Sequence, residues 1–155
     1  MTKKRKNLIL LFVDVAVFLS ISYIFCFPYK VDGGSMEPNY YTGDKVFISH
    51  ISAWSGNIER GDTVVCQLDD IQVIKRVIAL PGDKLEVRDG LVYVNYSLLN
   101  EPYLDKDIYT GGAICLTLNN DEYFVMGDNR GVSYDSRKVG AINGDDIKGK
   151  VVYKF

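Results

Sequence analysis

The first 27 residues constrain this chain more than any other feature. Residues 3–6 read Lys-Lys-Arg-Lys, and within 8–27 only Asp14, Ser20 and Ser22 are neither apolar nor aromatic. A helix over 8–27, at ~1.5 Å per residue, would be ~30 Å long, which matches the hydrocarbon core of a bilayer. We predict a basic cytoplasmic tail over 1–7, a transmembrane anchor over 8–27 and an extracytoplasmic part over 28–155, because clustered Lys and Arg stay on the cytoplasmic side.

Other interpretations of this segment fit less well. A cleavable leader has a shorter apolar part and a small-x-small site, whereas this segment ends in YIFCFPY. Bulky Phe25 argues against lipid attachment at Cys26. Asp14 lies within the apolar run, where a carboxylate near a helix centre costs about 2.5–3.5 kcal/mol on insertion scales. A contact with a partner helix and a merely tolerated cost are both open for Asp14.

Charge and cysteine content exclude several classes of protein. Residues 1–27 hold four of the 18 Lys+Arg and one of the 20 Asp+Glu, which leaves 28–155 with a net charge of −5. Such an acidic body argues against a nucleic-acid partner. Cys66 and Cys115 are far apart with no C-x-x-C motif, so we expect small buried thiols rather than a disulfide. One histidine and scattered cysteines do not supply a zinc site, and we expect no metal or cofactor.

The sequence pattern of the extracytoplasmic part is typical of a β domain. Short apolar runs recur between Gly, Asp, Asn and Pro, which is typical of strands. They cover residues 45–48, 63–67, 73–80, 84–87, 91–94, 123–126 and 150–155. Asp89-Gly90 between two such runs is a strong signal for a two-residue hairpin turn. No segment after the anchor keeps a 3.6-residue apolar period, so we expect a mainly β sheet or barrel with short helices.

The first motif with chemical potential is GGSMEP at 33–38. Two glycines before Ser35 allow a close backbone approach and unusual dihedral angles. A serine on such a turn can act as a nucleophile, with its own N–H directed at an oxyanion. A simple linker turn is the alternative. The nucleophile would need a base, and the single histidine, His50, lies in a polar stretch typical of an inert surface residue.

Two further motifs offer partners for Ser35. In KRVIALPGD at 75–83, strand alternation places Lys75 on one face with Val73 and Val77. Desolvation there would lower the pKa of Lys75 and make the neutral amine accessible, although Lys75 and Arg76 also fit a solvated strand edge. The third motif, GDNRGVSYDSR at 127–137, is either a polar surface loop or a network that positions a neighbour.

Taken together, these segments resemble the type I signal peptidases, membrane-bound serine endopeptidases that remove signal peptides from exported proteins. The boxes at 35–38, 60–65, 75–83 and 127–137 occur in the order of that family and cover most of 28–155. The resemblance implies a β catalytic domain of signal peptidase type. The short interval 84–126 implies that its accessory part is a minimal hairpin. Lysine as the base points to the bacterial branch.

The resemblance also implies roles for individual residues. Ser35 would be the nucleophile and Lys75 the general base. Ser133 would orient the lysine, with a supporting network of Asp128, Asp135 and Arg137. The substrate pocket would be formed by Val31, Met36, Tyr40 and Ile74. The oxyanion would be held by the Ser35 N–H, whereas Gly33 lacks the hydroxyl that some members carry at that position.

The expected function is cleavage of exported preproteins after a small-x-small sequence, at the plasma membrane, by a single-pass protein with a cytoplasmic amino terminus. Its partners would be signal peptides and the lipid bilayer. The alternative is a non-cleaving or dedicated accessory protein for the assembly of surface proteins such as pilins. Sortase fits poorly, because Cys115 precedes the Leu-Thr-Leu run instead of following a Thr-Leu-x-Thr run.

Overall fold

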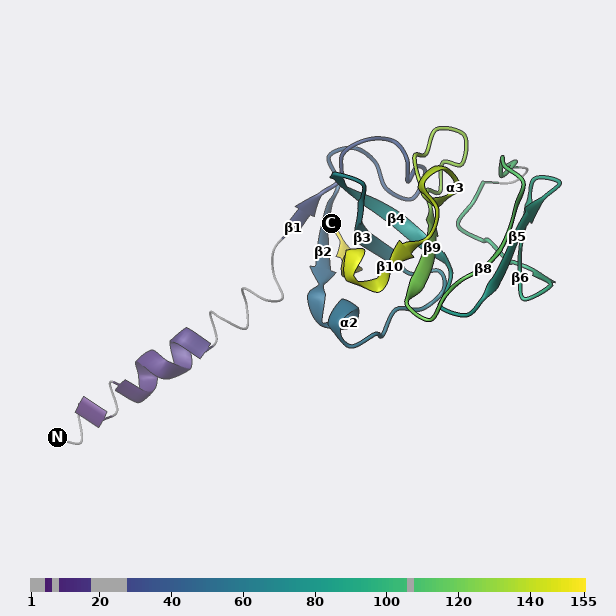
Figure 1. The fold of residues 1–155 in the computed structure, drawn as a ribbon. Coiled ribbons are helices and arrows are strands. Elements are labelled where there is room, and N and C mark those ends of the chain that lie inside the picture. Colours follow the sequence, from purple (N-terminus) through teal and green to yellow (C-terminus); the bar gives the residue numbers. More distant parts are fainter. Residues whose placement is uncertain (1–4, 7–8, 18–27, 106–107) are drawn as a thin grey trace.

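The computed structural model describes residues 5–6, 9–17, 28–105 and 108–155. The strands of 28–155 form two antiparallel sheets (Figure 1). The larger sheet has the order β1-β2-β11-β3-β4-β9-β10 and contains β1 (Pro28–Lys30), β2 (Lys45–Ser49), β3 (Thr63–Leu68), β4 (Ile71–Ala79), β9 (Glu122–Met126), β10 (Ile142–Asn143) and β11 (Ile147–Lys154). The second has the order β7-β6-β5-β8 and contains β5 (Lys84–Arg88), β6 (Leu91–Val94), β7 (Ser97–Leu98) and β8 (Ile114–Thr117). The helices beyond residue 28 are short: α2 (His50–Trp54), α3 (Ser136–Val139) and the 3₁₀ turn η1 (Gly144–Asp146).

The mainly β prediction is confirmed, and each of the apolar runs identified in the sequence coincides with a strand, although the runs 73–80 and 150–155 extend one residue past β4 and β11. The strands that the sequence pattern missed are β1, β7, β8 and β10. Three of them have only two or three residues, too few for an alternating pattern. β8 alternates between half-buried and exposed residues and carries no fully buried side chain, so its apolar signal is weak.

The accessory part is larger than the expected hairpin. The hairpin is present: Arg88 pairs with Leu91 around Asp89-Gly90, whose φ angles of 52° and 79° suit a turn with two left-handed residues. However, β7 and β8 flank it and complete a four-stranded sheet. Figure 1 shows this second sheet at the end of the body remote from β1.

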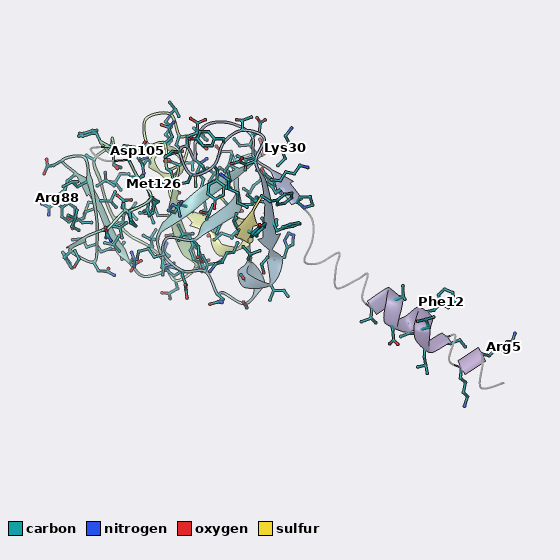
Figure 2. The ribbon with its side chains drawn as sticks, turned by 180° about the vertical axis from the view of Figure 1, so that it is seen from behind. Arg5, Phe12, Lys30, Arg88, Asp105 and Met126 are labelled. Atoms are coloured by element: carbon teal, nitrogen blue, oxygen red, sulfur yellow. The ribbon has the colours of Figure 1, made fainter. Side chains whose placement is uncertain are left out.

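Only part of the predicted amino-terminal anchor can be compared with the structure. Residues 9–17 are helical, whereas residue 8 and residues 18–27 lie outside the described residues, as does most of the 1–7 tail. Apolar side chains along 9–17 are exposed, with Leu10 at 60% and Phe12 at 68% (Figure 2). Among the described residues, no helix is both long and apolar enough to cross a membrane.

Three apolar clusters form the core. The first joins β4 and β9 of the larger sheet to β5 and β6 of the second. The second lies on the face of the larger sheet that carries Val64, Cys66 and Val77. The third lies on the opposite face, where Val65 and Ile74 pack against the segment that follows β1. The Ser35 turn therefore rests against a strand pair with a fixed register, Val65 opposite Ile74.

Both described thiols are free, but only one is buried. Cys66 lies in the core as expected, and burial raises the pKa of its thiol to about 12. The expectation of a buried Cys115 is wrong. β8 forms one edge of the second sheet, and its alternation turns Cys115 outward.

Candidate active site

Ser35 lies in the turn that follows β1. Gly33 has φ of +87°, a conformation that strains any residue with a Cβ. Met36 next to Ser35 is fully buried in the third cluster and fixes the turn to the sheet. The carbonyl oxygen of Ser35 accepts a hydrogen bond from the Asn129 N–H at 3.0 Å. The half-buried Ser35 side chain is thus held between the sheet and the loop that follows β9.

Lys75 lies on β4 and is 2% exposed. Its Nζ donates hydrogen bonds to Ser35 Oγ at 2.7 Å and to the Ile74 carbonyl at 2.9 Å. Burial lowers the pKa of Lys75, and the nearby Cys66, Asp135 and Asp128 oppose this effect. Because Lys75 is buried, its interpretation as a residue of a solvated strand edge is wrong. The lowered pKa means that the neutral amine forms more readily than in an exposed lysine.

β9 ends before it reaches the part of β4 that carries Lys75. β9 pairs with β4 only as far as Met126 opposite Arg76. In the part of the chain that the structure describes, residues 71–75 of β4 therefore have a strand partner, β3, on one side only. Such an edge can pair with an added extended peptide.

The side chain next to Lys75 points to the other face of β4. Arg76 Nε and Nη2 donate to the two oxygens of Asp128, at 2.8 and 2.6 Å. Asp128 is fully buried and also accepts from Asn39 Nδ2 at 2.9 Å. The Arg76 guanidinium carbon lies 4.1 Å from the centre of the Tyr103 ring. This pair fixes β4 to the loop that carries the third motif.

Asp135 and Arg137 form the other ion pair of this loop. Arg137 Nε and Nη2 donate to Asp135 at 2.9 and 2.8 Å, and the Gly127 N–H donates to Asp135 at 3.0 Å. Burial acts to raise the pKa of Asp135, but these hydrogen bonds outweigh it and lower the pKa. Asp135 also caps α3 through the backbone N–H of Arg137.

Ser133 lies beside the backbone of Ser35. A Cβ on Gly127 would stand 2.3 Å from Ser133 Oγ and 2.4 Å from the Ser35 carbonyl oxygen, so only glycine fits between them. Ser133 is 3% exposed, and its hydroxyl interacts with the Asp135 carboxylate, an interaction that helps to lower the pKa of Asp135. The structure thus places Ser133 beside Ser35, without the hydrogen bond to Lys75 that an orienting role implies.

The predicted pocket residues also lie together. Val31, Met36 and Ile74 are buried in the third cluster, and Tyr40 packs against it half-buried. The same cluster contains Val46, Ile48 and Val65, which were not predicted as pocket residues. The position of a Cβ on Gly33 faces open space, with no atom within 4 Å. A hydroxyl donor for an oxyanion is therefore not supplied at residue 33.

Arg130 was not identified as a site residue from the sequence. Its side chain donates to the Gly127 carbonyl at 3.0 Å and to Thr110 Oγ1 at 2.6 Å, and it forms an ion pair with Glu101. Its place in the GDNR motif is a usable signal. No sequence motif indicates Glu101 or Thr110 as partners of Arg130, because they lie 29 and 20 residues from it in the chain. His50 lies outside this site, with Nδ1 2.6 Å from the Lys148 carbonyl.

Comparisons with known proteins identify the family of this chain. A family model described as "Signal peptidase, peptidase S26" matches residues 4–155. The chain is 33% identical to signal peptidase IB of Staphylococcus aureus, an alignment that covers 97% of this chain and 91% of the relative. It is 37% identical to signal peptidase I S of Bacillus subtilis, covering 92% and 85%.

A solved structure supports the same assignment. The crystal structure of a signal peptidase I from Enterococcus faecalis matches with a TM-score of 0.55 and 29% identity, covering 61% of this chain and 97% of that chain. The chain therefore belongs to the signal peptidase family, peptidase S26, and is a bacterial type I signal peptidase, a serine endopeptidase that cleaves signal peptides.

Proposed function

We propose that Ser35 and Lys75 form a Ser/Lys dyad that cleaves exported preproteins after a small-x-small sequence. The observation that carries this proposal is the 2.7 Å hydrogen bond from Lys75 Nζ to Ser35 Oγ, made by a lysine that is 2% exposed. A nucleophilic hydroxyl needs a base within hydrogen-bond reach, and a buried amine with a lowered pKa meets that requirement better than an exposed lysine.

In acylation, neutral Lys75 takes the proton of Ser35 Oγ while that oxygen adds to the scissile carbonyl carbon. The Ser35 N–H donates to the resulting oxyanion. The C–N bond then breaks, and the leaving amine takes the proton from the Lys75 ammonium. In deacylation, Lys75 takes a proton from water as the water oxygen adds to the acyl carbon. Ser35 Oγ leaves with that proton, which restores the dyad.

The supporting network would hold the dyad in this geometry. Asp128 fixes Arg76, the neighbour of Lys75, and Asp135 fixes Gly127, which packs on the Ser35 carbonyl. The Ser133 hydroxyl, which interacts with Asp135, would form a hydrogen bond with the Lys75 amine as Lys75 gains and loses its proton. Such residues position the reacting groups and need not touch the substrate.

The substrate would bind in an extended conformation along the unpaired edge of β4 at residues 71–75. Its side chains before the scissile bond would face the apolar cluster around Val31, Met36, Tyr40 and Ile74. Because Val31 and Met36 are fully buried, that cluster offers little depth. Small side chains fit such a surface better than large ones.

The chain would be held at the plasma membrane by residues 8–27, with the amino terminus in the cytoplasm and 28–155 outside. The Lys-Lys-Arg-Lys run at 3–6 and the apolar composition of 8–27 support this orientation. The protein should remain in the membrane pellet after extraction at alkaline pH. Release into the supernatant would contradict the anchor.

The dyad is tested with the full chain in lipid vesicles and a preprotein substrate. Ser35→Ala and Lys75→Ala should each lower kcat/KM by about a thousandfold or more, because neither half of a dyad works alone. Ser97→Ala and Lys148→Ala are matched controls at an exposed and a half-buried position away from the site, and they should keep full activity. Circular dichroism checks the folding of each variant.

Full activity of either dyad variant would overturn the mechanism. If the wild-type protein binds a pilin-type precursor but cuts neither it nor a general secretory precursor, the accessory role becomes the better interpretation. Cleavage of only one of the two precursors would distinguish a dedicated from a general peptidase.

A further inference from the structure

A second feature of the third motif is a cavity of about 390 Å³ between two loops. Its lining residues come from 109–112 and 130–138: Tyr109, Gly111, Gly112, Arg130, Gly131, Ser133, Arg137 and Lys138. Three of them are cationic and none is acidic, in a domain whose net charge is −5. Since the surrounding domain would repel an acidic group, this cavity is a local exception that favours one.

Of the three cationic side chains that line the cavity, Lys138 is the one whose charge is available to a ligand. Arg130 and Arg137 are already paired, with Glu101 and Asp135. Lys138 is exposed, and its Nζ lies 5.6 Å from the centre of the Tyr134 ring. Throughout the described residues, no carboxylate lies within ion-pair distance of Lys138. Counting only the residues that the structure describes, the cavity thus presents one ammonium group without a carboxylate partner.

The cavity begins next to the dyad. Ser133 lines it and is 3% exposed. The Ser133 hydroxyl and the Ser35 carbonyl oxygen both lie within 2.4 Å of the position of a Cβ on Gly127. A peptide whose scissile bond sits at Ser35 therefore has this cavity as its neighbour.

The two sides of the dyad differ in their relation to the anchor. The third cluster contains Tyr29 of β1, the strand nearest to the amino-terminal segment (Figure 1). The cavity lies on the side of the second sheet. Thr110, in the segment 109–112 that lines the cavity, donates its backbone N–H to the Gly90 carbonyl in the β5–β6 turn at 2.9 Å. A preprotein whose signal segment is in the same membrane would enter from the β1 side. The residues after the scissile bond would then extend toward the cavity.

We propose that this cavity receives the first residues after the scissile bond and favours a carboxylate side chain there, through the Lys138 ammonium. The proposal rests on the function proposed above for Ser35 and Lys75. Gly111, Gly112 and Gly131 leave room for the backbone of a bound peptide, since a Cβ on Gly111 or Gly131 would meet no atom within 4 Å.

The test uses the full chain in vesicles and peptide pairs that differ in one residue, Asp or its uncharged isostere Asn, at each of the early positions after the scissile bond. At one of these positions the Asp peptide should have a kcat/KM about three- to fivefold higher, the size expected of a partly exposed ion pair. The ratio should fall to about one in Lys138→Gln, persist in Lys138→Arg and decrease at high salt. Lys148→Gln, a lysine away from the cavity, should keep the wild-type ratio.

Binding of the same peptides to Ser35→Ala separates this proposal from the dyad. A dissociation constant that favours Asp in Ser35→Ala but not in Ser35→Ala/Lys138→Gln supports the cavity even if the dyad mechanism fails. Equal cleavage of Asp and Asn peptides at every position by the wild type would overturn the cavity proposal and leave the dyad intact. An Asp preference that survives in Lys138→Gln would also overturn it.

Discussion

At the scale of single residues, the burial of Lys75 favours its proposed role as a base but costs stability. Its burial lowers the pKa, so the charged form is disfavoured in the folded protein. We expect kcat/KM to rise with pH as Lys75 loses its proton, with a midpoint below the ordinary lysine value of 10.5. Lys75→Arg should be inactive at every pH tested, because a guanidinium does not lose its proton. A midpoint at the ordinary value in the wild type would contradict this prediction.

The same shift affects stability. Because the neutral form of Lys75 is favoured by folding, the free energy of unfolding should fall as pH decreases from 10.5 toward the lowered pKa, and stay lower below it. Lys75→Met should remove this cost and raise the free energy of unfolding at neutral pH by about 1 kcal/mol while abolishing cleavage. Denaturant unfolding at pH 7 measures the difference. A less stable Lys75→Met protein would show that the two hydrogen bonds of the amine outweigh its desolvation.

At the scale of elements, the two tight turns of the second sheet respond in opposite directions to substitution. Tyr96 has φ of +67° in the β6–β7 turn, where glycine is free of strain. Tyr96→Gly should stabilise the fold by about 0.5 kcal/mol, since the strain relieved exceeds the exposed contact between Lys84 and the ring.

Gly90→Ala is the matched change in the β5–β6 turn. Gly90 has φ of +79°, and a Cβ there would stand 2.3 Å from the Tyr109 ring. It should destabilise the fold by about 1–2 kcal/mol. Thermal unfolding measures both changes, and effects of the same sign would contradict the assignment of these turns.

At the scale of the whole molecule, Arg130 joins the two sheets. Its fully buried side chain contacts Gly127 on the dyad side and Glu101 and Thr110 in the segment between β7 and β8. Arg130→Met leaves the Glu101 carboxylate without its cationic partner, and it should lower the free energy of unfolding by about 3–5 kcal/mol. Cleavage should weaken as well, because Gly127 packs on the Ser35 carbonyl.

Arg88→Met provides the control for Arg130. Arg88 is 59% exposed on the second sheet and lies 3.7 Å from Glu86, so its loss should change the free energy of unfolding by less than about 0.5 kcal/mol. Figure 2 shows Arg88 at the outer end of the body. Equal effects of the two substitutions would mean that Arg130 is not a link between the sheets.

Much of the fold follows from local patterns in the sequence. The longer strands alternate or carry continuous apolar runs, and Asp89-Gly90 has a backbone preference that needs no tertiary partner. The shorter strands were missed because two or three residues carry no period. The exposed Cys115 was missed for a related reason: a single residue type does not reveal which face of an edge strand is turned toward the core.

Ser35, Lys75 and the third motif were identifiable as candidates because their residue types and order are family features. The sequence by itself thus determined the strand pattern, the basic and apolar amino terminus, and the candidate dyad. Only the tertiary structure decided that Lys75 is buried and reaches Ser35 at 2.7 Å across 40 residues of chain, and that Arg130 joins Glu101 and Thr110. Strand patterns arise from neighbouring residues, whereas burial and ion pairing depend on which distant segments the register of the sheets brings together.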